Sequence, residues 1–215
     1  MSWLPIINAW VIFSGLVSLF LWKLGGVLLF VVASGIALYG LFDESLTNTK
    51  HYMSGFWMFL LSEVMAFGSL FTVCILTEEE GVSPLSSFVE LPLLGCFFLT
   101  GSSITVTAYH HYLGSGSSRV FLLGTIILGA CFIGVQLAEF YSASCDLLFC
   151  IYQAVCFCTV GLHFIHVLGG LVALSVLLIS GAEFRMSRVN VDCLVWYWHF
   201  VDYIWLFVYI IIYVC

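Results

Sequence analysis

The sequence predicts an all-α transmembrane protein with seven membrane-spanning helices. Of its 215 residues, 63% are hydrophobic and only 8% are charged, whereas about a quarter of the residues in a soluble domain are charged. The mean hydropathy is +1.17, and the apolar residues form runs of about 20 residues, the length that crosses a bilayer as a helix. The predicted spans are residues 4–22, 24–42, 52–76, 91–113, 119–142, 148–180 and 190–214.

The first two spans are separated only by Lys23 and the glycine pair at 25 and 26. Residues 4–42 are too long for one crossing, because a helix rises about 1.5 Å per residue. A tight helical hairpin is therefore predicted as an N-terminal domain, residues 1–42. The later spans predict a five-helix transmembrane bundle as a second domain, residues 52–215. Its sixth span, 148–180, is over-long and is expected to tilt or to project from the membrane.

The chain carries only five lysine and arginine residues against twelve aspartate and glutamate residues. It has no basic patch that would neutralise the phosphates of nucleic acid, which excludes that class of partner. Basic residues also predict orientation, because they are enriched in loops on the inner side of a membrane. The N-terminus is therefore expected in the matrix or cytoplasm, and the C-terminus outside. Four of the five basic residues fall on the N-terminal side: Lys50, Arg119, Arg185 and Arg188.

The nine cysteines include no CxxC motif. Most lie inside apolar runs, where cysteine behaves as a small hydrophobic residue, and no metal site is predicted among them. Cys156 and Cys158 are two positions apart, so they are expected on different sides of a helix. Cys145 and Cys150 would pair only if their loop faces an oxidising space, and the sequence leaves this open.

Three acidic residues fall within or near the hydrocarbon depth: Glu63, Glu139 and Asp202. A carboxylate is costly there, so each marks a function or a buried partner. His199 precedes Asp202 by three residues, which places both on one helix face, where they are expected to find hydrogen bonds on other helices. A second pair with this spacing, His163 and His166, is followed by two glycines that would let another helix approach closely.

A haem or copper site would need imidazoles that converge from different helices. His163, His166 and His199 are the candidate buried ligands, with the pair at 110 and 111 near the inner end of the fourth span. A bis-histidine haem is therefore an alternative. A carboxylate is available as a partner for each buried histidine, however, which favours structural polar contacts first and proton handling second. No metal ligand is predicted.

Several motifs resemble subunit III of cytochrome c oxidase, a haem–copper oxidase, in their order and approximate spacing. The similarity covers about residues 54–214, and the closing WYWHFVD motif is highly specific. The matching stretches are SEVMAFGSLF (62–71), VELPLLG (89–95), AYHHYL (108–113), QLAEFY (136–141), GLHFIHVLGG (161–170) and WYWHFVDYIWLFVY (196–209).

The resemblance implies a seven-helix bundle in which two N-terminal helices are splayed from five others, with structural phospholipids in the cleft. It implies a non-redox core subunit of complex IV of the respiratory chain, an enzyme that reduces oxygen to water with proton pumping. Haem and copper are expected in partner subunits, and subunit I is the expected direct partner. Subunit II and accessory subunits are further partners, and cytochrome c contacts this chain only through the complex. The expected location is the mitochondrial inner membrane or a bacterial plasma membrane.

The resemblance also assigns roles to residues, none of them catalytic. Glu63 matches the family's lipid-embedded glutamate, and Met53 stands where the family usually has an arginine. The resemblance implies assembly, lipid retention and proton-uptake support as the tasks of the chain. The expected lipid-binding residues are Glu63, Arg119, Arg185 and Arg188. The expected intramembrane polar or proton-related residues are Glu63, Glu139, His163, His166, His199 and Asp202.

Two alternatives remain at this point. One is subunit III of a quinol oxidase, which shares the fold, although the WYWHFVD ending fits the cytochrome c branch better. The other is an independent proton-coupled membrane carrier that uses Glu63, Glu139 and Asp202 as its proton sites.

Overall fold

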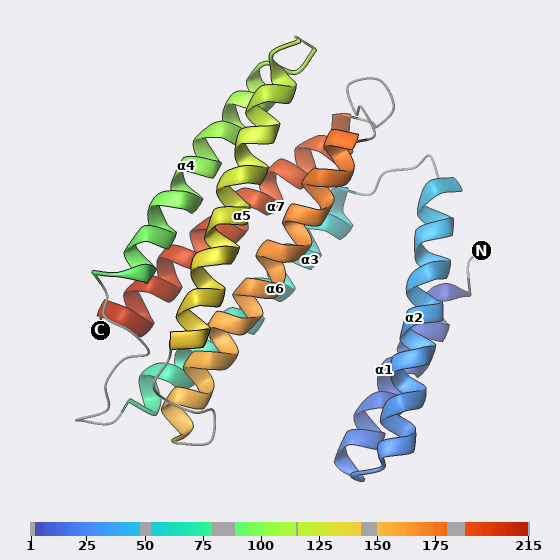
Figure 1. Cartoon of the computed structure of the whole chain (residues 1–215). Helices are drawn as coiled ribbons and strands as arrows, with labels where there is room; N and C mark the ends of the chain where they lie inside the picture. Colours follow the sequence, from blue (N-terminus) through green and yellow to red (C-terminus); the bar gives the residue numbers. More distant parts are fainter. Residues whose placement is uncertain are drawn as a thin grey trace. The chain divides into compact units, whose positions relative to one another are not determined.

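The computed structural model of the chain describes residues 3–47, 53–78, 89–114, 116–142, 150–179 and 188–214. These residues are almost entirely helical and contain no strand, which confirms the predicted all-α transmembrane fold (Figure 1). In chain order the helices are α1 (Leu4–Phe20), α2 (Leu24–Thr47), α3 (Met53–Leu76), α4 (Leu91–His111), α5 (Ser118–Ser142), α6 (Ile151–Ile179), α7 (Arg188–Val208) and the π-helix η1 (Tyr209–Val214).

The helix bounds agree with the predicted spans except at α2. This helix continues to Thr47, whereas the apolar run that predicted it ends at residue 42. Hydropathy marks only the part of a helix that suits lipid, whereas backbone hydrogen bonding can continue beyond it. Among the described residues, five of the seven predicted spans are long and apolar enough to cross a membrane, namely α3 to α6 and α7 with η1. The other two, α1 and α2, contain only shorter apolar stretches, Pro5–Phe20 and Leu24–Ala37.

The chain falls into two compact units, Met1–Tyr52 and Met53–Cys215. In the first unit, α1 and α2 pack against each other as a hairpin. The chain reverses at Trp22, whose φ of 51° is left-handed, and the Lys23 amide donates to the Ser18 carbonyl over 3.0 Å. A side chain at Gly26 would overlap that of Ser18, so glycine is required for the close approach of the two helices.

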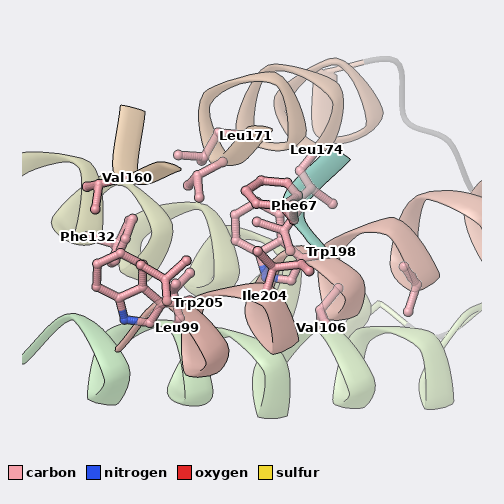
Figure 2. Close-up of a cluster of buried hydrophobic side chains, with 14 of the residues drawn as sticks. Phe67, Leu99, Val106, Phe132, Val160, Leu171, Leu174, Trp198, Ile204 and Trp205 are labelled. Carbon is pink, nitrogen blue, oxygen red and sulfur yellow. The ribbon is translucent and has the colours of Figure 1, made fainter. Parts of the chain in front are cut away.

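In the second unit, α6 packs against α3, α5 and α7, while α4 packs against α5 and α7. Aromatic and aliphatic side chains from all five helices meet between them (Figure 2). Trp198 and Trp205 of α7 are each only 1% exposed. The ring of Trp198 lies against Gly170, where an added Cβ would be 2.9 Å from Cε3, whereas Gly169 faces open space. The predicted close helix approach is therefore confirmed at Gly170 and wrong at Gly169.

In the second unit some polar side chains are buried within the apolar core, while apolar side chains cover the outside. Ile104 and Ile165 are 67% and 62% exposed, and this is the arrangement of a bundle whose solvent is lipid. The buried polar and charged residues are Ser102, Ser118, Thr125, Gln136, Glu139, Gln153, Thr159, His163 and Asp202.

Candidate functional site

A carboxyl–imidazole contact joins α3 to α6 inside the five-helix unit. Oε2 of Glu63 lies 3.0 Å from Nε2 of His166, and both side chains are mostly buried. Nδ1 of His166 lies 2.8 Å from the carbonyl oxygen of Leu162. A carbonyl only accepts, so Nδ1 carries a hydrogen.

The position of that hydrogen determines what the Glu63–His166 pair can do. With Nδ1 protonated, the contact at Nε2 requires one further proton. Either an imidazolium donates to a carboxylate, or a carboxylic acid donates to a neutral imidazole. At 3.0 Å the two atoms are close enough for a proton to pass between oxygen and nitrogen. The Tyr197 hydroxyl donates to the backbone carbonyl of His166 over 3.2 Å and connects this site to α7.

His163 faces a different helix from His166. Its Nε2 donates to the carbonyl oxygen of Val201 on α7 over 3.1 Å, and its side chain is fully buried between Phe132 and Trp205. Its Nδ1 has no hydrogen-bond partner within the described residues. The expectation of a carboxylate partner is therefore wrong for His163, because the neighbouring ring faces and a backbone carbonyl occupy the space around it.

His199 bonds to α4, which confirms that it finds hydrogen bonds on another helix. Nδ1 lies 2.7 Å from Oγ of Ser103, and Nε2 lies 3.3 Å from Oγ1 of Thr107. The Thr107 hydroxyl already donates to the Ser103 carbonyl over 2.8 Å. Thr107 must therefore accept from Nε2–H, and in neutral His199 Nδ1 accepts the Ser103 hydroxyl hydrogen.

Asp202 is 8% exposed and lies beside Ser103. In the part of the chain that the structure describes, its Oδ1 has no hydrogen-bond partner. The carboxyl group as a whole nevertheless has a side-chain hydrogen bond with Ser103, which confirms that Asp202 finds a partner on another helix. The i, i+3 spacing did place Asp202 and His199 toward the same neighbour, but hydroxyl groups of α4, rather than the Asp202 carboxylate, bind the imidazole.

Glu139 is only 3% exposed near the end of α5. The side-chain amide of Gln136, one helical turn earlier, donates to its Oε2 over 2.7 Å. The expectation that a carboxyl at this depth has a buried partner is confirmed here.

The expected lipid-binding residues do not form one cluster in the described structure. Arg119 and Arg188 are exposed, at the beginning of α5 and α7 respectively, and Arg185 lies outside the described residues. Glu63 lies ten residues into α3, about 15 Å along the helix from its first residue, and its polar contact is with His166. The pairing of Cys145 with Cys150, which the sequence left open, stays open, because Cys145 also lies outside the described residues.

The imidazoles of the three buried histidines do not converge. Those of His163, His166 and His199 contact α7, α3 and α4 respectively. Across the described ranges, no group of three or more histidine, cysteine, aspartate or glutamate side chains is placed to hold a metal ion. Within the described residues these three imidazoles form no haem ligand pair, and the absence of a redox centre stays a prediction.

The polar contacts that the sequence analysis missed include two between distant positions. His110 and Asp192 form an ion-pair contact of 2.8 Å between α4 and α7. Cys74 of α3 and Cys156 of α6 bring their Sγ atoms to 3.3 Å. Hydropathy and spacing within one span cannot reveal either contact, because both join positions more than 80 residues apart. The histidine at 110 was noted, but no signal in the sequence identified its partner.

These features define a multi-pass membrane protein whose intramembrane histidines and carboxyl groups mostly bind other helices of the same chain. Residues 30–215 match the family model for cytochrome c oxidase subunit III. The chain therefore belongs to the cytochrome c oxidase subunit III family, and it is a subunit of an oxidoreductase complex.

Curated relatives give the same assignment. Cytochrome c oxidase subunit 3 of Papio hamadryas is 33% identical over 182 residues, covering 76% of this chain and 69% of the relative. The subunit 3 of Mammuthus primigenius is 33% identical over 189 residues, with 85% and 70% covered. That of the organism Allomyces macrogynus is 30% identical over 177 residues, with 74% and 64% covered. These names support the cytochrome c branch over the quinol oxidase and carrier alternatives.

Proposed function

We propose that this chain binds no redox centre and supports subunit I of the oxidase by direct packing, by retaining phospholipid and by sustaining proton uptake. The reaction itself, reduction of oxygen to water with proton pumping, belongs to the complex. Subunit II and accessory subunits complete the set of partners, and cytochrome c reaches the chain only through the complex. The location we propose is the mitochondrial inner membrane, or a bacterial plasma membrane.

The Glu63–His166 contact is the observation that carries this proposal. It brings a carboxyl group and an imidazole, both mostly buried, to 3.0 Å, a distance at which the two can share a proton. A pair of this kind can exchange its proton with a neighbouring pathway without a metal ion. In our proposal the Glu63–His166 pair regulates the supply of protons toward subunit I. By holding α3 against α6, the pair also maintains the surface that packs against subunit I.

Phospholipid binding is supported by the surface of the five-helix unit. Arg119 and Arg188 are exposed where helices begin and can pair with lipid phosphate. Trp57, Met58 and Leu61 of α3 line an apolar groove together with Phe200 of α7, and an acyl chain fits such a lining. In this proposal the headgroups lie on the basic side of the membrane.

The orientation follows the basic residues. We propose that the N-terminus and the loop before α7 face the matrix or cytoplasm. Basic residues are enriched in loops on the inner side of a membrane, and four of the five basic residues share the side of the N-terminus: Lys50, Arg119, Arg185 and Arg188.

The test compares Glu63→Gln with Glu90→Gln in the assembled oxidase. Glu90 is exposed beside the first turn of α4 and serves as the matched control. Glu63→Gln keeps a hydrogen-bonding side chain but removes the shared proton. It should slow proton uptake and speed the loss of activity during turnover, while the haem absorbance bands of the complex stay unchanged. Glu90→Gln should match the unmodified complex.

Two results would overturn the proposal. If Glu63→Gln takes up protons and retains activity as Glu90→Gln does, the pair has no role in proton supply. If Glu63→Gln removes a haem or copper signal from a complex that still contains all subunits, the chain holds a redox centre.

A further inference from the structure

Two thiol groups meet in the interior of the five-helix unit. Sγ of Cys74 on α3 lies 3.3 Å from Sγ of Cys156 on α6. The two side chains are 0% and 1% exposed. A disulfide needs a separation of about 2.05 Å, so the sulfur atoms must approach each other by only about 1.3 Å.

The helices hold these two sulfur atoms in register. Cys74 follows Glu63 by eleven residues on α3, and Cys156 precedes His166 by ten residues on α6. Both intervals are close to three helical turns, about 15–16 Å. Because α3 and α6 run in opposite directions, the Glu63–His166 contact and the thiol contact lie on one continuous seam between them. The first contact therefore fixes the axial position of the second.

We propose that Cys74 and Cys156 form an oxidisable dithiol, a modification site that hydrogen peroxide converts to a disulfide tying α3 to α6. Peroxide fits the site because it is small and uncharged, whereas a bulky disulfide reagent cannot reach sulfur atoms that are fully buried. The function proposed above does not use either thiol.

The chemistry balances in two steps. One thiol attacks a peroxide oxygen, the O–O bond breaks, and the products are a sulfenic acid and one water molecule. The second thiol then attacks the sulfenic sulfur, the S–S bond forms, and the sulfenic hydroxyl leaves as water with the thiol proton. Overall, two thiols lose two electrons and two protons to one peroxide, which is reduced to two waters.

Neighbouring groups make the pairing specific and testable. Cys150 lies near Cys156, and its Sγ accepts a hydrogen bond from the backbone N–H of Gln153 over 3.4 Å. It is therefore the competing partner for Cys156. Cys158, two residues further along α6, is exposed on the outside of the bundle and serves as the matched control.

The experiment treats the intact oxidase in its membrane with hydrogen peroxide, blocks the remaining thiols in denaturant and maps linked peptides by mass spectrometry. We expect a peptide joining Cys74 to Cys156, absent before treatment and lost on reduction. Cys74→Ser and Cys156→Ser should abolish this peptide, and Cys158→Ser should keep it. Glutathione disulfide, a bulky oxidant, should yield none of it before the complex unfolds.

Any of three results would overturn the inference, and each can be observed in the complex without substitutions. One is recovery of Cys74 and Cys156 as free thiols or as separate sulfinic acids after peroxide treatment. Another is a linked peptide that joins Cys156 to Cys150 in place of Cys74. A third is oxidation by glutathione disulfide in the folded complex as fast as by peroxide, because the thiols would then be open to water.

Discussion

The indole nitrogen of Trp198 donates a hydrogen bond to the hydroxyl oxygen of Ser102, 3.0 Å away. The same serine donates to the Leu99 carbonyl over 2.7 Å, so its hydroxyl both accepts and donates. Gly129 of α5 and Gly170 of α6 lie against the ring of Trp198. One side chain of α7 therefore contacts three other helices at once.

The first prediction compares two neighbouring glycines. In Gly170→Ala the new Cβ meets the rigid Trp198 ring at 2.9 Å, whereas Gly169→Ala points into open space. Overpacking of this kind costs roughly 1–3 kcal/mol. Gly170→Ala should lower the temperature at which the subunit dissociates from the detergent-solubilised complex, and Gly169→Ala should leave it unchanged. Equal effects of the two substitutions would contradict the packing described for Trp198.

The second prediction concerns Asp202. Asp202→Asn keeps a polar side chain beside Ser103, so the haem content should stay unchanged while retention of the subunit weakens or proton uptake slows. Asp202→Leu should be worse, because it removes the polar contact with Ser103 altogether and puts an apolar side chain in its place. Haem spectra and the ratio of subunits III to I provide the measurement. Loss of a haem or copper signal in an assembled complex would show that Asp202 belongs to a metal site.

The third prediction concerns the buried amide that binds Glu139. Gln136→Leu removes the donor that lies 2.7 Å from Oε2 of Glu139. Because Glu139 is 3% exposed, the change should destabilise the subunit by about 1–3 kcal/mol. Leu137→Ala, on the exposed side of the same helix, is the control. Thermal dissociation of the purified oxidase measures both, and a larger loss for Leu137→Ala would show that the amide contact contributes little.

The fourth prediction is topological. Arg188→Cys and Glu78→Cys place thiols at the beginning of α7 and just after the end of α3, outside the apolar spans. A membrane-impermeant maleimide added to the outer face should label Glu78→Cys at once and Arg188→Cys only after permeabilisation, because basic loops lie inside. If residues 183–190 are labelled from outside without permeabilisation, the proposed orientation is wrong.

The spans were predictable because lipid imposes one strong constraint, about 20 apolar residues per crossing. Their lateral packing was not, because in a membrane both lipid-facing and core-facing positions are apolar. On α6, Ile165 is 62% exposed and Val167 is fully buried, yet the two residues are almost equally hydrophobic. Hydropathy therefore located every helix but gave no information about which helix lies beside which.

The candidate site was predictable in part for the same reason. Charged and polar residues at hydrocarbon depth identified Glu63, Glu139 and Asp202, since each is too costly to face lipid. Their partners were harder to identify. Hydroxyl side chains such as Ser103 and Thr107 cost little free energy in a membrane-spanning helix, because they can form hydrogen bonds with the backbone of their own helix. Their positions therefore carried no signal that they bind His199.

The seating of α6 has a mechanical consequence for the whole five-helix unit. His166 and Cys156 attach this helix to α3, while His163 and Gly170 attach it to α7. If a displacement of α3 rotated α6 about its own axis, His163 would move away from the Val201 carbonyl and Gly170 from the Trp198 ring. A movement of α3 that turns α6 is therefore expected to disturb the contacts of α6 with α7 as well.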